Sequence, residues 1–155
     1  MANFNQSTRN MIGNIDLGIR VDRATSTLPQ TTSLGLFDVE GGNILLTLIL
    51  GEVTTVIETQ ANNTNLESNP DVGTAVDLCA VLDITAKEVG SLFTITGTAG
   101  DAMQVGTGGG VIGQAVPVIV APGQIELHCA ASNTGAIKWS AWYIPLETGA
   151  YVAAA

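Results

Sequence analysis

The sequence predicts an all-β fold: an antiparallel β-sandwich or β-barrel-like (jelly-roll-like) single domain with an extended N-terminal arm. Three observations support this prediction. Thr, Val, Ile and Gly recur throughout, whereas the Glu, Lys, Gln and Arg runs typical of helices are few. Several segments alternate apolar and polar residues with a period of two, and turn-forming residues separate them. A length of 155 residues fits one domain with one core.

The opening part of the chain alternates only weakly and ends at Leu28-Pro29. We therefore expect residues 1–30 to form an extended arm and residues 31–155 to form the β body. The first 25 residues hold three arginines against two aspartates, whereas the rest holds two lysines against twelve carboxylates. The arm is thus a candidate for docking onto an acidic neighbour, and a plain solvated arm is the alternative.

The first strands of the body surround a pair of glycines. Leu36 to Glu40 leads into Gly41-Gly42 and then into Asn43 to Thr59, which predicts a strand, a tight turn and a second strand. Ile44 to Leu50 is apolar at almost every position. We therefore expect both faces of this strand to be covered, one by the core and the other by a neighbouring subunit.

The next two segments differ in pattern. Residues 60–70 are rich in Asn and other turn formers, and they predict a long exposed connection. Thr74 to Ile84 shows the clearest alternation of the chain, with apolar residues at the even positions and Asp77 and Asp83 at odd ones. This pattern predicts a half-buried strand whose aspartates face solvent.

The last part of the body predicts a second hairpin. Gln124 to Cys129 alternates, residues 132–135 supply turn chemistry, and Ala136 to Leu146 resumes the pattern. Trp139 and Trp142 fall on opposite faces of the final strand. We expect one tryptophan to pack in the core and the other to meet a partner.

Residues for catalysis or metal binding are few. The single histidine, His128, is adjacent to Cys129 on a predicted strand, so the two side chains point to opposite faces. Cys79 and Cys129 are expected to be buried, reduced thiols. Gly108 to Gly113 has the GxGxxG spacing, but a proline-containing β-like segment follows it where a helix would be needed, which indicates a surface loop. The sequence therefore predicts no enzyme, no cofactor and no metal site.

The composition points to a protein that is partly covered by other protein. Hydrophobic residues make up 46% of the chain and charged residues only 12%, against about 25% charged in an average soluble domain. A net charge of −9 disfavours nucleic acid as a partner. The longest apolar run, Ile44 to Leu50, is too short to span a membrane. These numbers favour a structural or interaction protein.

Several strand and turn motifs of the chain look familiar together: Phe37 to Gly42, Gly51 to Thr55, Gln60 to Thr64, Ile137 to Trp139, Tyr143 to Leu146 and Gly149-Ala150. They resemble a family of small structural proteins of tailed bacteriophages, the capsid decoration (cement, or auxiliary head) proteins encoded beside the major capsid protein. The resemblance implies a β-sandwich or barrel-like body, often a homotrimer, on the outer surface of the virion head where shell subunits meet. It implies synthesis in the host cytoplasm, and it brings no active site.

The expected function is therefore to bind the major capsid protein and stabilise contacts between its subunits. Aromatic anchors dominate interface energetics, and plain core packing is the alternative reading for each of them. A receptor- or glycan-binding β module of a tail or fibre is the alternative function, with residues 62–69 as its polar half. A small hydrolase would lack a general base with a partner. The residues expected to make subunit or capsid contacts are Arg9, Arg20, Arg23, Phe37, Val39, Trp139, Trp142, Tyr143 and Ile144.

Overall fold

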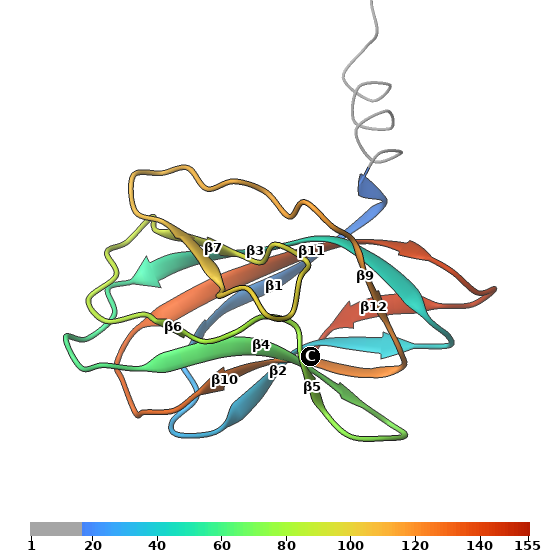
Figure 1. Ribbon diagram of the computed structural model, residues 1–155, viewed down its shortest axis with the longest axis horizontal. Coiled ribbons are helices and arrows are strands. Elements are labelled where there is room, and N and C mark those ends of the chain that lie inside the picture. Colours follow the sequence, from blue (N-terminus) through green and yellow to red (C-terminus); the bar gives the residue numbers. More distant parts are fainter. Residues whose placement is uncertain (1–16) are drawn as a thin grey trace, which may run out of the picture.

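The computed structural model describes residues 17–155, and all twelve elements that it defines there are β-strands. They form two antiparallel sheets of six strands each, which pack face to face (Figure 1). Neither sheet closes into a barrel within this range. The all-β prediction is confirmed, and of the two architectures that the sequence left open, the structure has the sandwich. No helix between residues 17 and 155 is long and apolar enough to cross a membrane.

The first sheet, here called sheet A, has the strand order β1-β11-β3-β7-β8, and β9 also pairs with β3. β3 and β11 are its longest strands, and they pair over nearly their whole length. The strands of sheet A are β1 (Ile19–Thr27), β3 (Ile44–Thr55), β7 (Leu92–Thr94), β8 (Gln104–Gly106), β9 (Val118–Val120) and β11 (Ala136–Pro145).

The second sheet, sheet B, has the order β12-β2-β10-β4-β5, and β6 also pairs with β4. β10 is central, with β2 on one side and β4 on the other. The strands of sheet B are β2 (Ser33–Glu40), β4 (Asn63–Pro70), β5 (Val76–Asp77), β6 (Leu82–Asp83), β10 (Gly123–Cys129) and β12 (Tyr151–Ala154).

The core lies between the inner faces of the two sheets, and Trp139 is its largest fully buried side chain. Trp139 on β11 lies directly opposite Gly51 on β3. A Cβ atom at position 51 would lie 2.8 Å from the indole ring, closer than packed carbon atoms approach. Because Gly51 has no side chain, the Trp139 ring can pack against the backbone of β3 at this position.

At two turns that the sequence predicted, the chain passes from one sheet to the other. The turn at Gly41-Gly42 joins β2 of sheet B to β3 of sheet A, and residues 130–135 join β10 of sheet B to β11 of sheet A. At these two places the predicted strands and turns are confirmed, but the prediction that the flanking strands pair as hairpins is wrong. Gly and Asn turn residues specify that the chain reverses, whereas the pairing partner of each strand is set by tertiary packing.

The predicted arm is wrong for the residues that the structure describes. Ile19–Thr27 form β1, which pairs with β11 and so belongs to sheet A. Leu28 and Pro29 are buried, and the Leu28 amide donates to the carbonyl of Gly135. Weak alternation misled the prediction because β1 is an edge strand and exposes most of its side chains. Residues 1–16 lie outside the described part.

The predicted polar loop at residues 60–70 is also wrong, because Asn63–Pro70 form β4. Asn65 donates from its side-chain amide to the Asp77 carboxylate over 2.8 Å, and Asn69 donates to Glu126 over 3.0 Å. These cross-strand bonds satisfy side chains that would otherwise favour a turn. Polar residues can therefore occupy an interior strand of the sheet.

The predicted strand at Thr74 to Ile84 is broken into two short pieces, β5 and β6. Between them Leu78 and Cys79, which are consecutive, are both buried, and this excludes continued alternation. Ala80 makes a parallel bridge to Ala102 and so leaves the ladder of β4. Asp77 and Asp83 are exposed, as predicted.

Candidate interaction surface

The outer face of sheet A carries a strip of apolar side chains. Direct cross-strand pairing places Trp142 beside Leu48, and Leu45 between Ile144 and Ile119. Cross-strand partners point to the same side of a sheet, so these side chains adjoin one another. Ile119 is 67% exposed, and the other five side chains are half-buried. This strip, the apolar face, consists of Leu45, Leu48, Leu50, Ile119, Trp142 and Ile144.

Charged residues border the apolar face in balanced pairs. The Arg20 guanidinium lies 5.2 Å from the centre of the Trp142 ring and donates from Nε to Asp22 over 2.8 Å. Lys138 and Glu52 form a second exposed ion pair at 3.0 Å. A hydrophobic centre with a charged rim is the usual arrangement of a protein–protein interface.

Two of the residues predicted to make contacts, Trp142 and Ile144, lie on the apolar face. The prediction that the two tryptophans divide between core and surface is thus confirmed for the core side, since Trp139 is 1% exposed. Whether Trp142 meets a partner stays a prediction. The continuous apolar run of residues 44–50 was the signal for Leu45, Leu48 and Leu50, which are half-buried while the inward-facing residues of the run are fully buried.

Four other predicted contact residues are buried in the core of the chain itself. Their exposed fractions do not exceed 4%, because alternation turns them toward the opposite sheet. Side chains in this position cannot reach a partner, so the contact prediction is wrong for them and the core-packing alternative holds. These residues are Phe37, Val39, Trp139 and Tyr143.

The three arginines that were predicted to dock as an arm are placed differently. Arg9 lies outside the described residues. Arg20 is exposed beside Trp142. Arg23 lies opposite Trp139 on β1, so its side chain turns toward the interior at the edge of the sandwich and is half-buried. Its guanidinium donates to the Ser26 hydroxyl, and burial lowers the pKa of Arg23 from its ordinary value.

The outer face of sheet B has the opposite chemistry. Glu126 on β10 is directly opposite Glu67 on β4, and Glu67 is directly opposite Asp77 on β5. This places three carboxylates in one row across three strands. Like charges directly opposite one another are unfavourable in a sheet, and neutral donors compensate here: Ser33 donates to Glu67, and Asn69 to Glu126. This row of Glu67, Asp77 and Glu126 is called the acidic row.

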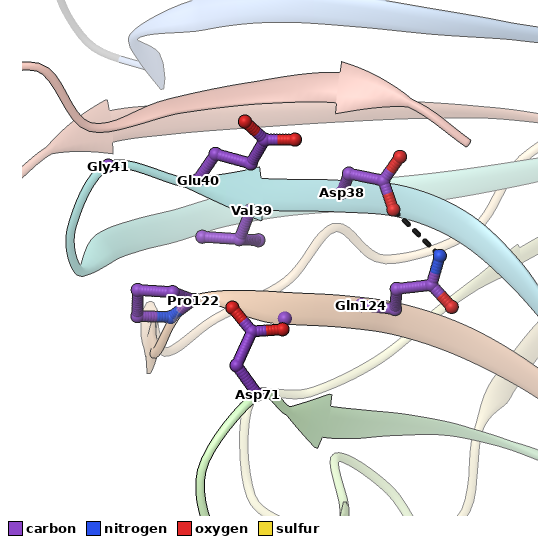
Figure 2. A pocket seen from close by; sticks show the side chains of 8 residues that line it. Asp38, Val39, Glu40, Gly41, Asp71, Pro122 and Gln124 are labelled. Atoms are coloured by element: carbon purple, nitrogen blue, oxygen red, sulfur yellow. Dashed lines mark hydrogen bonds between the residues drawn. The ribbon is translucent and has the colours of Figure 1, made fainter.

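A recess of about 450 Å³ opens beside the acidic row, where β2, β10 and the end of β4 meet. Figure 2 shows Asp38, Glu40 and Asp71 around it, with the Gln124 amide donating to Asp38 over 2.7 Å. The Tyr151 hydroxyl donates to Glu40, and this bond raises the pKa of Tyr151 above its ordinary value. Two of the three carboxylates are thus already engaged by neighbouring side chains.

The residues considered for chemistry are dispersed. Within residues 17–155 no three His, Cys, Asp or Glu side chains are grouped in a way that could hold a metal ion. His128 lies on the outer side of β10 near Ser33, whereas Cys129 is buried on the inner side. Cys79 and Cys129 are both buried and unpaired, and burial raises the pKa of each thiol. Gly108 to Gly113 form an exposed loop between β8 and β9.

Comparison with known proteins gives no match: no family model, no curated protein and no solved structure corresponds to this chain. The features that bear on function are therefore those of the chain itself, a β-sandwich with one apolar and one acidic outer face.

Proposed function

We propose that this protein is a structural binding module that works through the apolar face of sheet A. More specifically, we propose a capsid decoration protein of a tailed bacteriophage, which binds the major capsid protein on the outer surface of the head and stabilises contacts between shell subunits. The resemblance adds a homotrimer to this proposal. The observation that supports it is the apolar face, a contiguous strip in which Ile119 is exposed and the other side chains are half-buried.

The mechanism is mechanical rather than catalytic. Binding would remove the exposed parts of Leu48, Trp142 and Ile144 from water, with a gain of about 25 cal/mol for each Å² of apolar surface buried. Trp142 is the strongest anchor because large aromatic side chains dominate the energetics of interfaces. The rim pairs Arg20–Asp22 and Lys138–Glu52 would fix the orientation of the bound subunit.

A sedimentation experiment tests the proposal. Purified protein is mixed with capsids that lack it, the capsids are pelleted, and bound protein is measured over a range of concentrations. We expect saturable binding and a rise in the temperature at which the shells open. Trp142→Ala should weaken binding at least about tenfold, because an interface anchor is lost.

Tyr151→Ala is the matched control, since Tyr151 is an exposed aromatic residue on sheet B. It should bind capsids like the wild type. Equal binding by all three proteins would remove the apolar face from the proposal, and the absence of wild-type protein from the pellet would refute the decoration function.

The alternative of a glycan- or receptor-binding tail module has less support. Its polar half was assigned to residues 62–69, which form β4 and its approach rather than an exposed loop. Asn62 and Asn65 are buried and hydrogen-bonded to neighbouring groups. They are therefore not free to bind a sugar.

A further inference from the structure

β1 is the edge strand of sheet A and has nine residues, longer than the short edges that sheets usually expose. One side of β1 pairs with β11. Among residues 17–155, no backbone hydrogen bond to another strand satisfies its other side. The strand thus presents unpaired N–H and C=O groups to whatever lies beside it.

The regular part of β1 is short and has a clear centre. Ile19 to Arg23 pair with β11 in unbroken register, and an irregularity follows between Arg23 and Ser26. Val21 is the middle of this five-residue segment. A second strand that runs antiparallel along the free side would find regular backbone over these residues only.

The charges of β1 are complementary to themselves about that same centre. Arg20 and Asp22 flank Val21 and point to the outer face. If two β1 strands pair antiparallel about Val21, Arg20 of each copy lies opposite Asp22 of the other. Directly opposite residues have Cβ atoms about 5 Å apart, and opposite charges there stabilise the pair.

Contacts with β11 order the side chains of Arg20 and Asp22 on the outer face of the sheet. Asp22 accepts from Arg20 Nε at 2.8 Å and from the Ser140 hydroxyl at 2.6 Å, in both cases through the same oxygen, Oδ1. An arginine has five N–H donors, so its terminal amino groups can reach a second carboxylate while Nε keeps the first. The Trp142 ring beneath the guanidinium restricts its position further.

We infer that β1 is a self-association edge, where two copies of this protein pair antiparallel about Val21 and join their A sheets into one continuous sheet. The occupant is a second copy because the charge pattern is complementary to itself. The inference does not depend on the proposed capsid function. It predicts a two-fold contact, which can coexist with a three-fold contact made by other surfaces.

The pairing would also enlarge the apolar face. Trp142 lies on β11, immediately beside β1, so the apolar faces of the two copies would be separated only by the paired β1 strands. Both faces would lie on the same side of the joined sheet. A partner could then bind both copies at once, which raises the strength of binding without any new contact.

Charge exchange tests the inference. The mass of the full-length protein in solution is measured by analytical ultracentrifugation over a wide concentration range for the wild type, Arg20→Asp, Asp22→Arg and the double variant Arg20→Asp/Asp22→Arg. We expect the wild type to form dimers, or hexamers if the trimer also forms. Each single reversal should raise the dissociation constant of the two-fold contact at least about tenfold, and the double variant should restore it.

Lys138→Asp is the control, because it makes the same change of charge on the same face but on β11, one strand in from the free edge. It should associate like the wild type. Association that is the same in the wild type and both single reversals, or that the double variant fails to restore, overturns the inference; so does amide hydrogen exchange in β1 that is equally fast at low and high protein concentration. Capsid sedimentation is scored separately, so a protein that pairs but does not bind shells refutes only the proposed function.

Discussion

The two outer faces of the sandwich are built from opposite chemistry on the same framework. On sheet A the central strands expose leucine, isoleucine and tryptophan, and the charges at the rim are balanced. On sheet B the central strands carry the acidic row, whose hydrogen-bond partners are neutral side chains. The charged residues, which make up only 12% of the chain, are therefore unevenly distributed between the two faces. Repulsion between acidic faces favours contacts through sheet A.

The same division holds within one strand. On β11, Trp139 is buried against Gly51, and Trp142 lies three residues later on the opposite side. One tryptophan stabilises the fold, while the other is available for binding. Single substitutions can therefore test whether the two sides of the strand have these separate roles.

The largest expected effect is on the inner side of β11. Trp139→Ala should lower the free energy of unfolding by about 3–5 kcal/mol, because it leaves a cavity between the sheets. Trp142→Ala should cost only about 1–2 kcal/mol, because its ring is partly in water already. Urea denaturation of both variants measures the difference. Equal losses would place Trp142 in the core and remove it from the candidate interface.

Removing one carboxylate should change the free energy of unfolding by a smaller amount, and the sign of the change should differ between the two faces. Glu67→Gln relieves repulsion at the centre of the acidic row and should stabilise the protein by about 0.2–1 kcal/mol at low salt. Glu52→Gln breaks the exposed pair with Lys138 and should destabilise it by no more than about 0.5 kcal/mol. Thermal unfolding at low and high salt checks both values. A loss of stability in Glu67→Gln would show that the row is not repulsive.

The smallest expected effect is on the loss of stability at acidic pH. Hydrogen bonds from the Thr85 side chain and from the Asn62 and Thr85 amides lower the pKa of Asp83 below its ordinary value of 3.8. Bonds from Ser140 and Arg20 lower the pKa of Asp22 on sheet A in the same way. A lowered pKa in the folded state contributes stability that is present above the unfolded pKa of 3.8 and is lost as the pH falls through the lowered value.

We therefore expect Asp83→Asn and Asp22→Asn to lower stability slightly at neutral pH and to flatten its decline below about pH 4, so that each variant approaches the wild type in acid. Urea unfolding at a series of pH values measures this decline. Since both carboxylates are exposed, solvent screening keeps the effect small. A variant with an acid decline as steep as the wild type would refute the role of that aspartate.

Much of the fold could be predicted from composition and alternation. β2, β10 and β11 are long strands whose alternate residues are buried, which leaves a clear pattern, and β3 was predicted from its continuous apolar run. What could not be predicted is which strands pair. The turns at Gly41-Gly42 and at residues 132–135 are as tight as hairpin turns, yet each connects the two sheets.

The errors lie where tertiary contacts override local pattern. β4 is polar because its outward side chains bond across to β5 and β10, and nothing in residues 63–70 alone reveals those partners. Residues 74–84 alternate but pair with β4 only at their two ends. For the candidate surface, a tryptophan on each side of β11 was predictable, whereas the burial of Phe37 and Val39 depends on which side of β2 faces sheet A.

The pairing of β1 with β11 has a consequence for synthesis of the protein. Ile19 and Tyr143, which are partners in sheet A, lie near opposite ends of the sequence. β2 likewise needs β10 and β12, so neither early strand has a partner until almost all of the chain has left the ribosome. Contacts this distant in sequence make folding slow and leave strand edges uncovered meanwhile. A chain that stops before β11 would therefore lack the central partner of sheet A, and its first strands would remain open to aggregation.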